Sequence, residues 1–142
     1  MTSRQDRPRL PYRMAALAAV GAARLLAGRS PHRIKHVLLA LRHGAAPATP
    51  KQAESARHAV TMVSPRCAGE YCVQRSLATT LLCRLLGTWP TWCVGVRTAP
   101  FTAHAWVEAD GRPVGEPHAP GDYRLILAVP AKPELPLAAM PT

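Results

Sequence analysis

The sequence predicts an α+β fold, with helices in the first part of the chain and an antiparallel sheet in the last part. Apolar residues recur at helical spacing up to Gly87, and they alternate with a period of two after Trp89-Pro90. Within the second part, Asp110-Gly111 is a hairpin-turn signal. Because the chain has 142 residues, of which 48% are hydrophobic, we expect one compact domain with a substantial core.

Three helical patterns precede residue 64. The first covers about Tyr12–Ala27. The second follows Ser30-Pro31, where Ser is a favoured N-cap and Pro a favoured first-turn residue, and it stops near Gly44. A Pro-containing connector, 45–50, leads to the third helix, which we expect over Lys51–Val63.

A fourth, strongly helical pattern starts at Glu70 and closes with Gly87, the expected left-handed terminator. Stretches rich in Val, Trp, Ile and Leu then predict strands at Trp92–Arg97, Ala103–Glu108, Arg112–Glu116 and Tyr123–Val129. We expect the fourth helix to pack across this small sheet.

These elements divide the chain into three parts. We expect residues 1–13 to form a flexible basic N-terminus, residues 14–130 a single domain, and residues 131–142 a Pro-rich tail. Within the domain, residues 14–63 make the helical part, and residues 67–130 make the fourth helix and the sheet.

The apolar run after Met14 follows basic residues, as it would in a signal peptide. However, Arg24 interrupts the run, which is shorter than the roughly 20 apolar residues that span a bilayer. We therefore expect an amphipathic helix of the domain rather than a membrane segment, and a cytoplasmic protein.

The formal net charge of +10 raises the possibility of nucleic-acid binding. The basic residues are scattered along the chain, and the one dense cluster lies in the N-terminal segment. Few aromatic residues are present, and none is interleaved with basic residues in a stacking motif. We expect no nucleic-acid partner; the basic surface is either a solvated face or a docking face for an acidic peptide or partner.

Four cysteines are present: Cys67, Cys72, Cys83 and Cys93. They could form two disulfides in a secreted protein, but nothing else indicates secretion, so we expect thiols. Their spacing does not match a zinc site, and we expect no metal or cofactor.

Cys72 is the candidate nucleophile, because the N–H groups and dipole at the start of a helix stabilise a thiolate. The alternative is that Cys72 is an inert core residue. Cys83 and Cys93 have the surroundings of core residues, and Cys67, in the preceding loop, is the second candidate. His104, on a predicted strand, is the candidate base, although a strand histidine can also be a satisfied core group.

A carboxylate that orients the imidazole could come from Glu108, Asp110, Glu116 or Asp122. Glu108 shares a face with His104 but is roughly 13 Å along the strand, and Asp110 is farther still. A strict two-residue turn would pair Glu116 with Ala105, on the face opposite His104. Glu116 in this role therefore predicts a bulged hairpin or a three-residue loop.

The order and spacing of these residues resemble those of the lasso peptide biosynthesis B protein, in the peptidase half of its split form. The resemblance is dense from Cys67 to Glu116, and its motifs begin at Cys72, Leu81, Gly95, Phe101 and Pro113. It implies a transglutaminase-like fold, related to papain-like cysteine proteases. It also implies leader-peptide removal from a precursor peptide by a Cys-His-Asp triad. The implied partners are a separate leader-recognition protein and an ATP-dependent lasso cyclase.

Carried onto this chain, the triad is Cys72, His104 and Glu116, where Asp is the more usual acid, with Asp110 and Asp122 as alternates. Two other functions stay open. The same thiol could transfer an acyl group to an amine, or the chain could be a non-catalytic binding module that uses its basic N-terminus.

Overall fold

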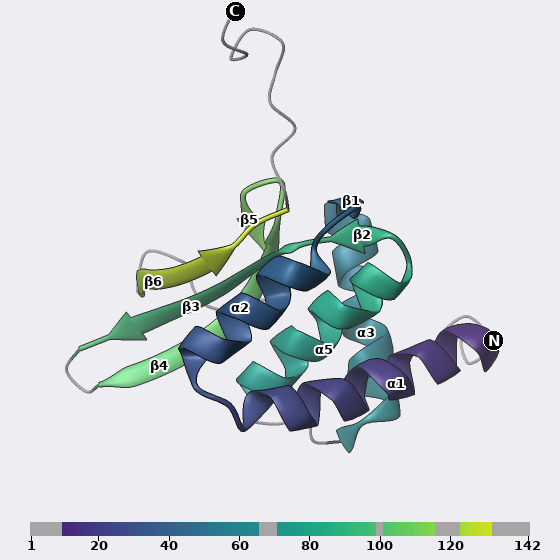
Figure 1. The fold of residues 1–142 in the computed structure, drawn as a ribbon, viewed down its shortest axis with the longest axis horizontal. Coiled ribbons are helices and arrows are strands. Elements are labelled where there is room, and N and C mark those ends of the chain that lie inside the picture. The colour runs from purple at the N-terminus through teal and green to yellow at the C-terminus, as the bar shows by residue number, and fades with distance from the viewer. Residues whose placement is uncertain (1–9, 66–70, 99–100, 116–122, 132–142) are drawn as a thin grey trace, which may run out of the picture.

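The computed structural model describes residues 10–65, 71–98, 101–115 and 123–131. It confirms the predicted α+β class, with the helices before the four-stranded sheet (Figure 1). The helices are α1 (Leu10–Ala27), α2 (Pro31–Leu41), α3 (Pro50–Val63) and α5 (Cys72–Leu85). The strands are β1 (Ala46–Pro47), β2 (Thr88–Trp89), β3 (Thr91–Arg97), β4 (Thr102–Ala109), β5 (Arg112–Pro113) and β6 (Arg124–Val129).

Local signals determine most helix ends. The Ser30 side chain accepts a hydrogen bond from the Arg33 N–H, as expected of the N-cap before α2. Thr49 and Gln52 form a capping box at the start of α3. After α5, Gly87 has a φ of 90°, as predicted for the terminating glycine.

Helix α1 starts earlier than expected. It begins at Leu10, so residues 10–13 are helical, although the sequence placed them in the flexible N-terminus. Among the described residues, α1 is the one helix whose length and composition would allow it to cross a membrane. In the fold, it packs against α5 and α3 through Ala16, Ala19, Val20 and Ala23.

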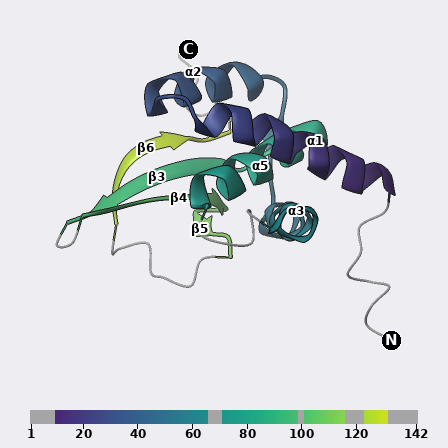
Figure 2. The same ribbon diagram turned by 90° about the horizontal axis from the view of Figure 1, so that it is seen from below.

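The sheet has the strand order β5-β4-β3-β6, and each pair of adjacent strands is antiparallel. The connector before α3 also contains β1, which forms a short parallel pair with β2. The sequence did not predict this pair. Figure 2 shows α5 between α1 and the sheet. Helix α5 therefore lies across the sheet, as predicted, and α1 and α3 pack on the sides of α5 that do not face the sheet.

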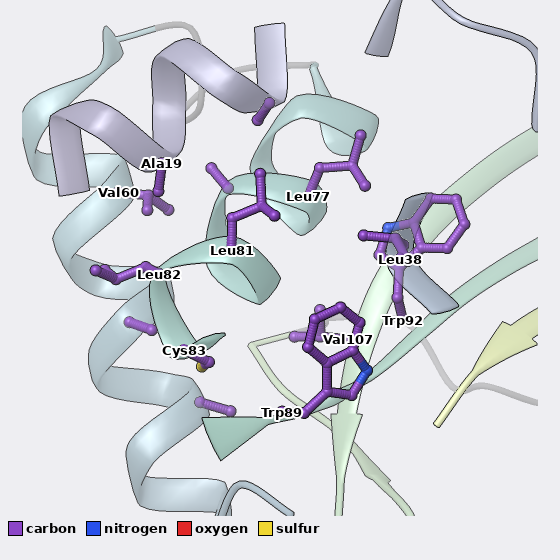
Figure 3. Close-up of a cluster of buried hydrophobic side chains, with 14 of the residues drawn as sticks. Ala19, Leu38, Val60, Leu77, Leu81, Leu82, Cys83, Trp89, Trp92 and Val107 are labelled. Carbon is purple, nitrogen blue, oxygen red and sulfur yellow. The ribbon is translucent and has the colours of Figure 1, made fainter. Parts of the chain in front are cut away.

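The core surrounds α5, which packs on one face of β3 and β4 and on the other helices (Figure 3). Trp92 from β3 and Val107 from β4 belong to it, together with Leu77 and Leu82 from α5. The indole Nε1 of Trp92 donates a hydrogen bond to Ser76 Oγ on α5, at 3.0 Å. This contact identifies the face of the sheet that meets the helix.

The hairpin between β4 and β5 corrects one prediction. Ala109 pairs with Arg112, and Asp110 and Gly111 have φ values of 51° and 73°, so the turn has two residues and not three. Strand β5 then ends at Pro113, before the predicted end of the strand at Glu116, which lies outside the described residues.

Candidate active site

Cys72 is the first residue of α5, and its side chain is half-buried. The preceding residue, Tyr71, provides no side-chain cap hydrogen bond, and the first turn contains no acidic residue. The N–H groups of this turn therefore face neither a capping oxygen from Tyr71 nor a carboxylate from their own turn. Such N–H groups can stabilise a thiolate or an oxyanion.

A cavity of about 390 Å³ opens beside Cys72. Arg24, Ala27 and Gly28 line it from the end of α1, and residues 71–74 line it from the start of α5. The buried Oε1 atom of Gln74 has no hydrogen-bond partner within the described part of the chain. The cavity therefore lies between a thiol-bearing residue, Cys72, and a basic one, Arg24.

The two other described cysteines are core residues, as predicted. Cys83 and Cys93 are each about 1% exposed. Burial raises the pKa of the Cys83 thiol to about 11. Burial also raises the pKa of Cys93, and the hydrogen bond from its Sγ to Glu108 Oε2 raises it further. Both thiols therefore stay protonated near neutral pH, whereas Cys67 lies outside the described residues.

His104 lies on β4, half-buried, on the face that points away from the core. Its ring stacks on Trp106, with centroids 5.8 Å apart, and it lies 5.5 Å from the ring of Tyr123. The neighbours of His104 along the strand that point toward the core are Ala105 and Val107. His104 is not among the residues that line the cavity beside Cys72.

The two candidate residues nevertheless lie toward the same end of the helix and sheet. Cys72 is one turn before Ser76, and His104 is three residues before Val107, which pairs with Trp92. The hydrogen bond between Ser76 and Trp92 places these two reference positions, one on the helix and one on the sheet, next to each other. Strand β5 pairs only with Glu108 and Ala109, so the described residues provide no strand partner along that edge of β4 beside His104.

The candidate carboxylates have different outcomes. Glu108 Oε2 accepts hydrogen bonds from Trp106 Nε1, at 3.0 Å, and from Cys93 Sγ, at 3.2 Å. Asp110 is exposed in the turn, six residues from His104 and so roughly 20 Å along the strand. Glu116 and Asp122 lie outside the described residues, but the residue after Asp122 is Tyr123, whose ring contacts His104.

Comparison with known families gives one result. Residues 16–128 match the model of the transglutaminase-like superfamily. The chain belongs to this superfamily. The match spans every helix and strand except the first residues of α1 and the last residue of β6. No curated protein and no solved structure matches the chain.

Membership of the transglutaminase-like superfamily agrees with a helix that starts at a cysteine and packs on an antiparallel sheet. Members of this superfamily are often cysteine-based enzymes. The sequence had no signal for the Cys72 cavity itself, because Arg24 and Gln74 are far apart in the chain and meet only through the packing of α1 on α5.

Proposed function

We propose that this chain is a cytoplasmic cysteine peptidase that removes the leader from a ribosomally made lasso peptide precursor, with Cys72 as nucleophile and His104 as base. The observation that carries the proposal is a half-buried thiol at the first residue of α5, open to a cavity. The buried environments of Cys83 and Cys93 support the choice of Cys72 among the described cysteines.

In this mechanism His104 takes the proton of the Cys72 thiol, and the thiolate attacks the carbonyl carbon of the last leader residue. The first-turn N–H groups of α5 stabilise the oxyanion. His104 then protonates the departing amine of the core peptide, leaving a thioester on Cys72. Water hydrolyses the thioester to release the leader as a carboxylic acid and to regenerate the thiol.

The position of His104 places a specific demand on this mechanism. The imidazole has to reach the thiol around the edge of β4 that has no described strand partner beside it. The proposal therefore requires the imidazole and the thiol to come together when substrate binds. Asp122, the neighbour of Tyr123, or Glu116 would orient the ring, but Glu116 can do so only if the chain leaves the register of the two-residue turn after Pro113. Asp110 is the least suitable because of its distance along the strand.

The cavity suggests how the substrate is held. Arg24 can pair with a carboxylate or a carbonyl oxygen of the precursor. We propose that a separate leader-recognition protein presents the precursor and that an ATP-dependent cyclase uses the released core peptide. Removal of the leader itself needs neither nucleotide nor metal.

The test is cleavage of a lasso peptide precursor, with the leader-recognition protein present, followed by mass spectrometry. We expect wild type and Cys67→Ala to cut one bond, and Cys72→Ala and His104→Ala to leave the precursor intact. If Cys72→Ala cuts as fast as wild type, the proposal is wrong. Glu116→Gln, Asp122→Asn and Asp110→Asn, compared in the same assay, identify the acidic residue.

Acyl transfer to an amine is the second candidate, because the superfamily contains transferases as well as peptidases. The same assay with an added primary amine separates the two functions. A leader that carries the mass of the amine would indicate transfer, and a leader that ends in a free carboxylate would indicate hydrolysis.

A further inference from the structure

Helix α1 has apolar residues on two opposite faces. The inner face, which packs on α5 and α3, carries mostly small buried side chains, those of Ala16, Ala19, Val20 and Ala23, with the half-buried Tyr12 and Leu26 packed beside them. The outer face carries larger ones, and these are exposed: Leu10 by 71%, Met14 by 60%, Leu17 by 45% and Leu25 by 80%. A helix that only packs on its own domain has its large apolar residues inside, so this outer apolar row needs another explanation.

The spacing of the outer apolar row is that of a helix–helix contact. Leu10, Met14 and Leu17 are separated by four and three residues, and Gly21 continues the row to Leu25. A Cβ atom at Gly21 would meet nothing within 4 Å, so the row is open to a close approach. The row is roughly 23 Å long, which matches about four helical turns of a partner.

The outer apolar row ends in a groove between α1 and α2. This groove has a volume of about 520 Å³ and an apolar lining that includes Leu25, Val37, Leu41 and Leu81. Arg29 and Arg33 also line it. A concave apolar groove can take the side chains of a helix.

The charge around this surface has one sign. Residues 10–53 contain seven Lys and Arg residues and no Asp or Glu. Arg13 and Arg24 are exposed on α1 close to the outer apolar row. The acidic residues of the described part of the chain are elsewhere, Glu54 on α3 and Glu108 and Asp110 in the sheet. The complementary partner therefore carries negative charge.

We propose that the outer apolar row and the α1–α2 groove form a docking surface for an amphipathic helix of a partner protein whose apolar face is flanked by Asp and Glu. Docking itself does not depend on the peptidase mechanism. Arg24 also lines the cavity at Cys72, so a docked partner would lie at the edge of that site. Delivery of a peptide to Cys72 by this partner rests on the proposed function.

The probes are two synthetic three-heptad helices with the same leucine seam, one flanked by Glu and the other by Lys. Binding to the full chain is measured by fluorescence anisotropy at two salt concentrations. We expect the Glu-flanked helix to bind at least tenfold more tightly than the Lys-flanked helix and to weaken as salt is added.

The double variant Met14→Ser/Leu17→Ser keeps the net charge and should lose at least tenfold in affinity for the Glu-flanked helix. The control is Leu125→Ser/Ile126→Ser on β6, where the two side chains are similarly exposed, by 52% and 58%, and affinity should be unchanged. Equal affinities of the two double variants would overturn the proposal, because charge alone would then explain binding.

Other occupants of the surface give different results. Binding to phosphatidylglycerol vesicles that is lost in Met14→Ser/Leu17→Ser, with no binding of the Glu-flanked helix, would show a membrane contact instead. A dimer that the same variant dissociates would show a second copy of the chain. Cys72→Ala should bind the helix as wild type does. The docking proposal can therefore stand or fall separately from the peptidase proposal.

Discussion

The two ends of α5 differ in what surrounds them. In the first turn, from Cys72 to Arg75, every side chain is half-buried, and the turn borders a cavity. From Ser76 to Cys83 every side chain is buried, whichever way it points. A single helix thus carries one half-buried thiol beside a cavity and one, three turns later, that the core excludes from water. Environment, more than residue type, separates a candidate nucleophile from a packing residue.

The largest expected effect separates the two thiols by activity. Cys72→Ala should lower precursor cleavage by more than about 10³-fold, because the attacking atom is removed. Its midpoint of urea unfolding should stay close to that of wild type. Cys83→Ala should do the reverse, with cleavage retained and the midpoint lowered. If both variants are folded at the assay temperature and lose cleavage to a similar extent, Cys72 and Cys83 do not differ in role as described here.

A second prediction compares packing at the two ends. Leu82 is fully buried, so Leu82→Ala should lower the free energy of unfolding by about 2–5 kcal/mol through lost transfer energy and a cavity. Val73→Ala, in the half-buried first turn, should cost clearly less. Urea denaturation followed by circular dichroism measures both, and equal costs would contradict a difference in packing.

A third prediction concerns alkaline pH. Because the pKa of Cys83 is raised from 9.0 to about 11 on folding, the unfolded chain loses this proton first as pH rises. The stabilising contribution is therefore complete below pH 9 and is lost between about pH 9 and 11, by roughly 2 kcal/mol. Under reducing conditions, Cys83→Ala should lose less stability than wild type over this range, and parallel curves would argue against a buried thiol.

The smallest effect is at the junction of the two regions. Ser76→Ala removes the acceptor of the Trp92 indole N–H and should lower the free energy of unfolding by about 1–2 kcal/mol. Ser76→Thr, which keeps a hydroxyl, is the control for the loss of the acceptor. Chemical denaturation of Ser76→Ala with an unchanged midpoint would show that the indole finds another acceptor.

Most of the fold could be predicted because its signals are local. The cap at Ser30, the glycine at position 87 and the Asp110-Gly111 turn identify element boundaries to within a few residues. The β1–β2 pair could not be predicted, because Ala46 and Thr88 meet only after the chain has folded. The turn length was also uncertain from sequence, since Asp-Gly suits loops of two or three residues.

For the candidate site, the sequence identified the helix start and the strand but not the orientation of the sheet. Alternation shows that His104 and Trp106 share one face and Ala105 and Val107 the other. It does not show which face meets α5, because both faces carry large apolar residues. The Ser76–Trp92 hydrogen bond resolves this, and it places His104 on the outer face.

The most direct test of the central claim is to trap the covalent intermediate. Wild-type protein is mixed with precursor and recognition protein, quenched in acid within milliseconds to seconds, and analysed by intact mass and peptide mapping. The account predicts an added mass equal to the leader acyl group, located on the peptide that contains Cys72. An adduct on Cys67, or cleavage by Cys72→Ala at the wild-type rate, would contradict it.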